Sequence, residues 1–409
     1  MKSIRILPLG SFNSILIWMG ILGLCITMIW VGLAFKVSKN SSAVIDGIAK
    51  DAQEILARCK DEKDRPFCYD REIPKLMKSL SLEDTFKVIQ IVQTTDQGYP
   101  YCHVLGHTLG GLETAKDPSK WQEVAGRCST NMCSNGCMHG VFQERFRKEN
   151  AADIPPDKIV TMLSGICGPR EGWNPTHLVQ GSCTHALGHL AMYLNNADTK
   201  KSLTLCENIA VHKDGYDLRP LCYDGVFMQL FQPLGPDDEF LVKGKVPTAS
   251  QLDVFCAPYT GEEYNSCWSE SWPLAITSLR ESAENATTFC NKLERTGGRS
   301  ACLHDIFYIM ATQFNLDEAR MLTYCAQGSD LVRNQCFAAV AARLIEVDSQ
   351  NGSKAVHFCS MAETVAGGDA CYESLARSAS YDFGHNSDLL INMCTSLPVK
   401  WKALCMKEN

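Results

Sequence analysis

Cysteine spacing is the feature that most constrains how this chain can fold. Twenty of its 21 cysteines lie beyond residue 58, an even number, as a set of disulfide bonds requires. A reducing cytosol rarely tolerates so many thiols unless they bind metal. The cysteine content therefore places the body of the chain in an extracytoplasmic or luminal oxidising compartment.

Sixteen of these cysteines form two interleaved series. In the last four units the step is 34 or 35 residues in each series, and each first-series cysteine precedes its partner by 9 to 16 residues. A fixed period of this size is typical of a repeat protein. The first series is Cys128, Cys167, Cys206, Cys256, Cys290, Cys325, Cys359 and Cys394, and the second is Cys137, Cys183, Cys222, Cys267, Cys302, Cys336, Cys371 and Cys405. Pairing between the series, with Cys59–Cys68 and Cys102–Cys133, predicts ten bridges.

The sequence around each cysteine predicts a helix. In residues 316–328 and 335–347, for example, apolar side chains recur every three or four positions, and a polar link containing Gly328 separates the two stretches. Each unit is therefore expected to be a helical hairpin closed by one disulfide, which contributes roughly 2–3 kcal/mol. Alternating strand patterns are nearly absent. The expected fold is all-α: a single transmembrane helix followed by a disulfide-stapled α-solenoid.

The length of the unit resembles that of tetratricopeptide and Sel1-like repeats. Their signature residues, a Trp-Leu-Gly-Tyr pattern and a closing proline, are not found here. The likeness is one of period alone, and it implies about nine stacked hairpins without implying a function.

One segment near the N-terminus is apolar enough to cross a membrane. Residues 12–35 contain no charged side chain, and about 20 apolar residues span a bilayer as a helix. A cleaved signal peptide would have a shorter apolar core and a small-residue cleavage site, so an uncleaved anchor is favoured. The cysteines then place the N-terminus in the cytoplasm.

These observations divide the chain into five segments. The predicted order is a cytoplasmic tail at 1–11, the membrane anchor at 12–35, a linker with the first helical hairpin at 36–95, histidine-bearing repeats at 96–247, and cysteine-stapled repeats at 248–409.

Histidines recur at one position of the second helix in successive hairpins. When these helices are aligned with one another, a first column and a column four residues further on contain residues able to bind metal. Residues four apart lie on the same face of a helix, so a pair of them can share one ion. The first column is His103, His139, His185 and Asp224, and the second is His107, Gln143, His189 and Met228.

Neighbouring helices of a repeat protein pack at about 8–10 Å, so these columns predict one polar cavity. We expect its metal ligands to be His103, His107, His139, His185, His189 and Asp224. Imidazole favours zinc, iron or copper. His139 or Glu144 is expected to supply acid–base chemistry if the ion is catalytic.

Glycines accompany the histidines at matching helical positions. Gly106, Gly110, Gly140, Gly188 and Gly225 lie in or beside the two columns. Since glycine weakens a helix by roughly 1 kcal/mol relative to alanine, its recurrence predicts that these helices approach closely.

Two other interpretations of the histidines stay open. They can be a packing motif in which imidazoles hydrogen-bond between repeats. Alternatively, His139 can form a zinc cluster with Cys128, Cys133 and Cys137, although the disulfide series already accounts for two of those cysteines. Asp224 alone also suits a helix N-terminus, where an acid is favourable to the helix dipole.

Common enzyme motifs are missing. The chain has no His-Glu-x-x-His, Gly-x-Ser-x-Gly, phosphate-loop or dinucleotide-binding pattern, and its net charge of −7 provides no basic face for nucleic acid. Two functions follow: a membrane-anchored metal-dependent hydrolase or oxidoreductase, or a non-catalytic interaction module whose C-terminal repeats contact a protein partner.

Overall fold

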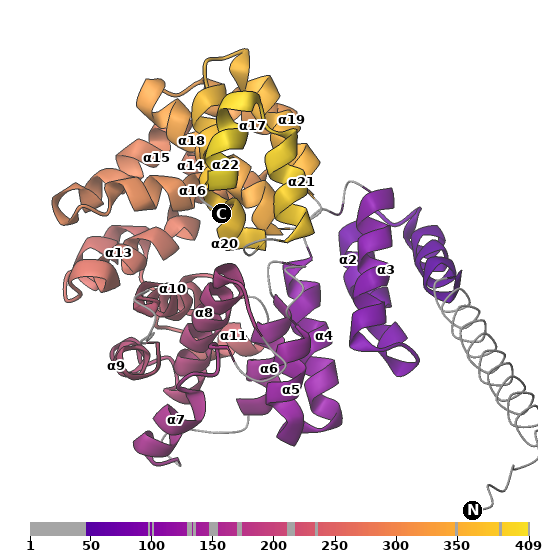
Figure 1. Cartoon of the computed structure of the whole chain (residues 1–409). Helices are drawn as coiled ribbons and strands as arrows, with labels where there is room; N and C mark the ends of the chain where they lie inside the picture. The colour runs from indigo at the N-terminus through magenta and orange to yellow at the C-terminus, as the bar shows by residue number, and fades with distance from the viewer. Residues whose placement is uncertain are drawn as a thin grey trace, which may run out of the picture.

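The fold is all-helical wherever the chain is described. A computed structural model describes residues 46–407, apart from 97–98, 100–101, 129–132, 134–135, 147–153, 170–173, 211–216, 234–235, 348–350 and 384–386. These residues contain no β-strand (Figure 1). The predicted tail and anchor lie outside the described residues. Among the helices within them, none is both long enough and apolar enough to cross a bilayer.

The helices are mostly short and follow one another with brief connections. The first half consists of a helix at 46–59, then α2 (Arg65–Glu72), α3 (Leu82–Thr95), α4 (His103–Lys116), α5 (Trp121–Arg127), α6 (Gly136–Phe146), α7 (Pro156–Leu163), α8 (His177–Leu194), α9 (Thr199–Ile209), α10 (Arg219–Phe231) and α11 (Pro236–Val242).

The second half continues the pattern, with some 3-10 turns between helices. Its α-helices are α12 (Leu252–Cys256), α13 (Gly261–Glu270), α14 (Ile276–Glu281), α15 (Ala283–Cys290), α16 (Arg299–Gln313), α17 (Glu318–Ala326), α18 (Asp330–Val347), α19 (Gly352–Glu363), α20 (Gly368–Phe383), α21 (Asp388–Ser396) and α22 (Val399–Lys407). The 3-10 segments are η1 (Ile73–Lys78), η2 (Pro118–Lys120), η5 (Ala249–Gln251), η6 (Trp272–Ala275) and η7 (Asn291–Thr296).

Short polar side chains begin several of these helices. Ser81, Asp317 and Ser387 each accept a hydrogen bond from the backbone N–H three residues on, at the starts of α3, α17 and α21. Such caps satisfy one of the four N–H groups that a helix leaves without partners. The helix expected at 316–328 is therefore confirmed as α17, and the one expected at 335–347 is the later part of α18.

All ten expected disulfides are formed. Eight join the two cysteine series within a unit, over separations of 9 to 16 residues. The other two are Cys59–Cys68 and Cys102–Cys133. Because Cys128, Cys133 and Cys137 are all bridged, they have no thiolate to offer, and the alternative zinc cluster is wrong.

The helices that contain the second-series cysteines pack against one another, and α4 packs at the start of this row. In the first half α4 contacts α6, α6 contacts α8, α8 contacts α10, and α10 contacts α13. In the second half α16 contacts α18, and α18 contacts α20. The chain then folds back, since α20 contacts α8 and the rings of Tyr381 and His177 lie 6.5 Å apart. Stacked hairpins are thus present, and a regular solenoid stays a prediction.

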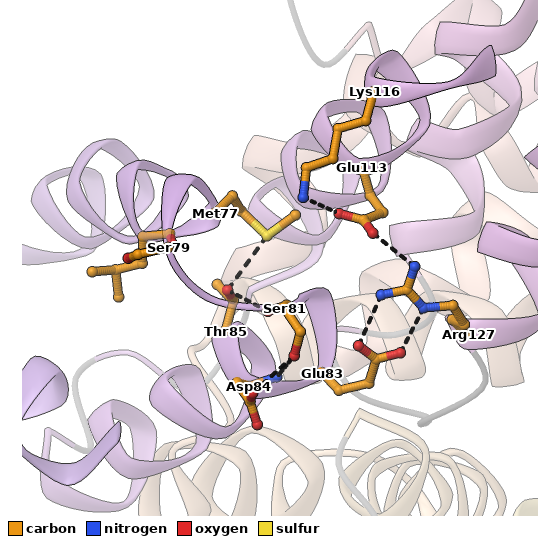
Figure 2. Close-up of polar contacts among 10 residues, drawn as sticks. Met77, Ser79, Ser81, Glu83, Asp84, Thr85, Glu113, Lys116 and Arg127 are labelled. Carbon is orange, nitrogen blue, oxygen red and sulfur yellow. Dashed lines mark hydrogen bonds and ion pairs between the residues drawn. The ribbon is translucent and has the colours of Figure 1, made fainter. Parts of the chain in front are cut away.

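One arginine joins the first hairpin to the histidine-bearing helices. Arg127, at the end of α5, donates to both carboxylate oxygens of Glu83 on α3, at 2.6 and 2.9 Å, and to Glu113 on α4 at 2.7 Å (Figure 2). The guanidinium lowers the pKa of Glu83 to about 2, so this contact stays charged at neutral pH. It fastens α3, α4 and α5 together.

The disulfide pattern yields a direct prediction. Ten bridges use every cysteine except Cys25, so thiol labelling of the denatured, unreduced chain is expected to modify one cysteine, and labelling after reduction all 21. Mass spectrometry of the labelled chain measures both numbers. Ten or more modified cysteines before reduction would contradict both the bridges and the oxidising compartment.

Candidate metal centre

The five predicted histidines lie together. His103 and His107 come from α4, His139 from α6, and His185 and His189 from α8. The imidazole of His139 is central: its ring centre lies 4.8 to 5.6 Å from those of the other four. The convergence expected from the two columns is confirmed.

Glycines allow the helices to come this close. A Cβ atom at Gly140 on α6 would collide with the carbonyl oxygen of His107, and one at Gly110 on α4 with that of Cys137. The same arrangement recurs between α8 and α10, where Gly188 faces Cys222 and Gly225 faces His185. The two helix pairs therefore touch backbone to backbone, as the recurring glycines predict.

Two groups of three histidines have the spacing of a metal site. The first is His103, His107 and His139, and the second is His139, His185 and His189. Within each group, one nitrogen from each ring lies within 4.8 Å of the others. His139 belongs to both groups and is 3% exposed, so the two possible ion positions are adjacent and share a ligand.

Burial favours the neutral form of four of these five imidazoles. It lowers the pKa of His107, His139 and His185 well below 6.5, and the neighbouring histidines lower it further because their charges would repel. Burial also lowers the pKa of His189. Since the neutral ring is the form that binds metal, the cluster is ready to bind an ion at neutral pH.

The hydrogen-bond partner of His103 determines which of its nitrogens carries the proton. Its Nδ1 lies 3.1 Å from the backbone carbonyl oxygen of Cys133, which can only accept. Nδ1 is therefore the donor, and the neutral ring presents a lone pair at Nε2. The Cys102–Cys133 disulfide holds that carbonyl beside the start of α4.

A relay of hydrogen bonds determines the tautomer of His107. The hydroxyl of Tyr193 on α8 donates to the carboxylate of Asp238 on α11, so its oxygen is left to accept from Gln143 Nε2 at 3.5 Å. The amide of Gln143 must then present Oε1 to His107 Nδ1, at 3.3 Å. His107 donates there, and its Nε2 also carries a lone pair.

These assignments bring two lone pairs face to face. His103 Nε2 and His107 Nε2 lie 3.1 Å apart. A shared proton would require an imidazolium, which burial disfavours. Two nitrogens that bind one ion at about 2.0–2.1 Å lie about 2.9–3.4 Å apart, so an ion satisfies both nitrogens at the observed separation.

The second pair has the same separation between its Nε2 atoms. His189 Nδ1 donates to Gln229 Oε1 at 2.7 Å, and His189 Nε2 faces His185 Nε2 at 3.1 Å. The Nδ1 atom of His139 is buried without a hydrogen-bond partner in the described structure. Leaving a buried polar atom unsatisfied costs about 1–3 kcal/mol, a cost that a bound ion would offset.

Asp224 and Glu144, the other two predicted site residues, belong to neither group. Asp224 lies on α10 beside α13, where it hydrogen-bonds Ser266, and burial raises its pKa to about 6. Its acidic neighbours are Glu270 and Asp305, whose pKa values are raised well above normal by burial and mutual repulsion. Glu144 lies half-buried on α6.

Three supporting residues escaped the sequence-based prediction: Gln229, Tyr193 and Asp238. Gln229 follows Met228 of the second column directly, and this adjacency is a signal that the sequence does contain. Tyr193 lies outside both histidine columns, and Asp238 comes from a helix without cysteine or histidine. Comparisons with protein-family models, curated proteins and solved structures find no match to this chain.

The contact between helix backbones predicts the effect of adding one methyl group. Gly140→Ala is expected to lower the free energy of unfolding by about 1–3 kcal/mol or more, because backbone atoms of α4 cannot move aside. Gly47→Ala is the matched control: it is also helical, nothing lies near its Cβ position, and alanine favours a helix. Denaturant titration of both variants measures the effect, and equal stabilities would contradict the close packing.

Proposed function

We propose that this chain is a membrane-anchored, extracytoplasmic protein that binds a transition metal through its histidine cluster. The observation that carries the proposal is the face-to-face arrangement of His103 Nε2 and His107 Nε2, 3.1 Å apart, with both protons held on the opposite side of the rings. The ten disulfides favour an oxidising compartment, and residues 12–35 would provide the anchor.

The donor set suits zinc, copper or iron. It consists of neutral imidazoles, without a thiolate or carboxylate in either three-histidine group, and these metals prefer nitrogen ligands. Gln143 and Gln229 orient His107 and His189 from behind, as supporting residues do in known metal sites.

Catalysis would require an open coordination position. The first group supplies three histidines and leaves such a position, so a hydrolase or oxidoreductase would act there. His139 is then a ligand, and Glu144 on the same helix is the remaining acid–base residue. The C-terminal repeats, which lack the histidine columns, would serve as scaffold or as a surface for a protein partner.

Removing the shared histidine tests metal binding. The full-length chain in detergent, stripped with a chelator and titrated with zinc, is expected to bind at least one ion. His139→Ala takes a ligand from both groups, and we expect zinc affinity to fall by roughly a hundredfold or more. Competition with a metal-sensitive dye measures it, and circular dichroism verifies the fold.

His357→Ala is the control for this experiment. His357 lies on α19 outside both groups and pairs with Glu318 at 2.9 Å, so its loss should leave zinc affinity unchanged. A wild-type chain that folds but binds no zinc, copper or iron would favour the packing motif and a non-catalytic interaction module.

The lowered pKa values predict an unusual pH dependence of binding. Three histidines with an ordinary pKa of 6.5 would lose affinity about fiftyfold between pH 7.5 and 6.0, since protons compete with the metal. In the second group burial already removes those protons, so we expect a loss of less than about threefold there. Zinc titrations at the two pH values measure the difference, and a fiftyfold loss would show that the rings titrate normally.

A further inference from the structure

The two histidine groups differ at one matching position. Gln143 on α6 and Met228 on α10 each lie six residues after a second-series cysteine. Gln143 contacts the Nδ1 side of His107, whereas the sulfur of Met228 lies 3.2 Å from His185 Nε2, the side that faces the other ligands. Gln229, the next residue on α10, takes the supporting position at His189.

The sulfur of Met228 is therefore an additional electron-pair donor in the second group. Gln229 supports His189 there, as Gln143 supports His107 in the first group. His185 Nε2 faces both the sulfur of Met228 and His189 Nε2, at 3.2 and 3.1 Å. A neutral imidazole has one protonated and one unprotonated nitrogen, so His185 binds an ion through Nε2 when its proton lies on Nδ1.

A simple N–H···S hydrogen bond would explain the sulfur contact less well. It would place the proton of His185 on Nε2, opposite a thioether, and a thioether is a weak acceptor. With the proton on Nδ1, three electron-pair donors meet without a hydrogen between them: two imidazole nitrogens and one sulfur.

The charge of the ligand set narrows the choice of ion. His139, His185, His189 and Met228 are all neutral donors, and two of the three histidines are buried. The cost of moving an ion out of water rises with the square of its charge, so neutral ligands favour a monovalent cation. Thioether sulfur is a soft ligand that selects Cu(I).

On these grounds, and resting on the proposed metal-binding function, we propose that the second group is a copper(I) site whose fourth ligand is Met228. The first group, which has no sulfur donor, accepts the metals that imidazole prefers. Copper(I) then prefers the second group and zinc the first, and the two adjacent positions share His139 as a ligand.

The test compares Met228→Leu with the wild-type full-length chain in detergent under anaerobic conditions. Cu(I) affinity, measured by competition with a bicinchoninate chelator, is expected to fall at least roughly tenfold in the variant. Zinc affinity should change less than threefold, because the histidines remain. Met361→Leu, a partly buried methionine on α19, is the matched control and should change neither.

X-ray absorption of the wild-type copper complex tests the ligand without any substitution. It should show one sulfur at about 2.3 Å beside the nitrogens, and that sulfur should disappear in Met228→Leu. A copper complex with nitrogen ligands alone, or an unchanged Cu(I) affinity in the variant, would overturn this assignment while leaving metal binding intact. A chain that binds neither copper nor zinc would refute the proposed function itself.

Discussion

The backbone contact between paired helices is the constraint on which the histidine cluster depends. Where α4 meets α6, and again where α8 meets α10, a glycine of each helix faces a carbonyl oxygen of the other. The helix backbones are closer than any side chain at the glycine positions would permit, and between α4 and α6 this brings ligand nitrogens of His103, His107 and His139 within 4.8 Å of one another. Disulfides beside His103, His139 and His185 hold the same helix ends.

Burying imidazoles close together causes repulsion between their nitrogen lone pairs, and the surrounding groups do not remove this repulsion. The carbonyl of Cys133 and the amide of Gln143 accept the Nδ1 protons of His103 and His107, so the Nε2 lone pairs of these two rings point at one another. Burial opposes the protonation that would otherwise relieve this. A cation relieves it at the observed separations, which is why we favour metal binding over packing alone.

The sequence predicts those features that depend on spacing along the chain. Eight disulfides follow from the cysteine period, and the convergence of five histidines follows from that period with the i, i+4 spacing, because a repeated unit places equivalent residues at equivalent heights. The other two disulfides, Cys59–Cys68 and Cys102–Cys133, follow from pairing the cysteines that remain. What the columns cannot predict is the neighbour of each helix. His139 and Asp224 share a column, yet His139 has histidines on both sides, whereas Asp224 faces α13 with Ser266 and Glu270.

The residues that orient the histidines could not be predicted from the sequence for the same reason. Tyr193 and Asp238 act on His107 only through Gln143, across three helices, and no short-range pattern connects them. The roles of Gln143 and Met228 also differ although their positions match, since one contacts Nδ1 and the other Nε2. Which ring nitrogen a side chain contacts depends on how the helices pack, and spacing along the chain does not give this.

Anomalous diffraction from crystals of the metal-loaded chain tests the central claim most directly. We expect an anomalous peak between His103 Nε2 and His107 Nε2 or between His185 Nε2 and His189 Nε2, at about 2.0–2.1 Å from each nitrogen. A map without a peak at either position, from crystals grown with zinc and copper, would contradict it and leave the histidines as a packing motif.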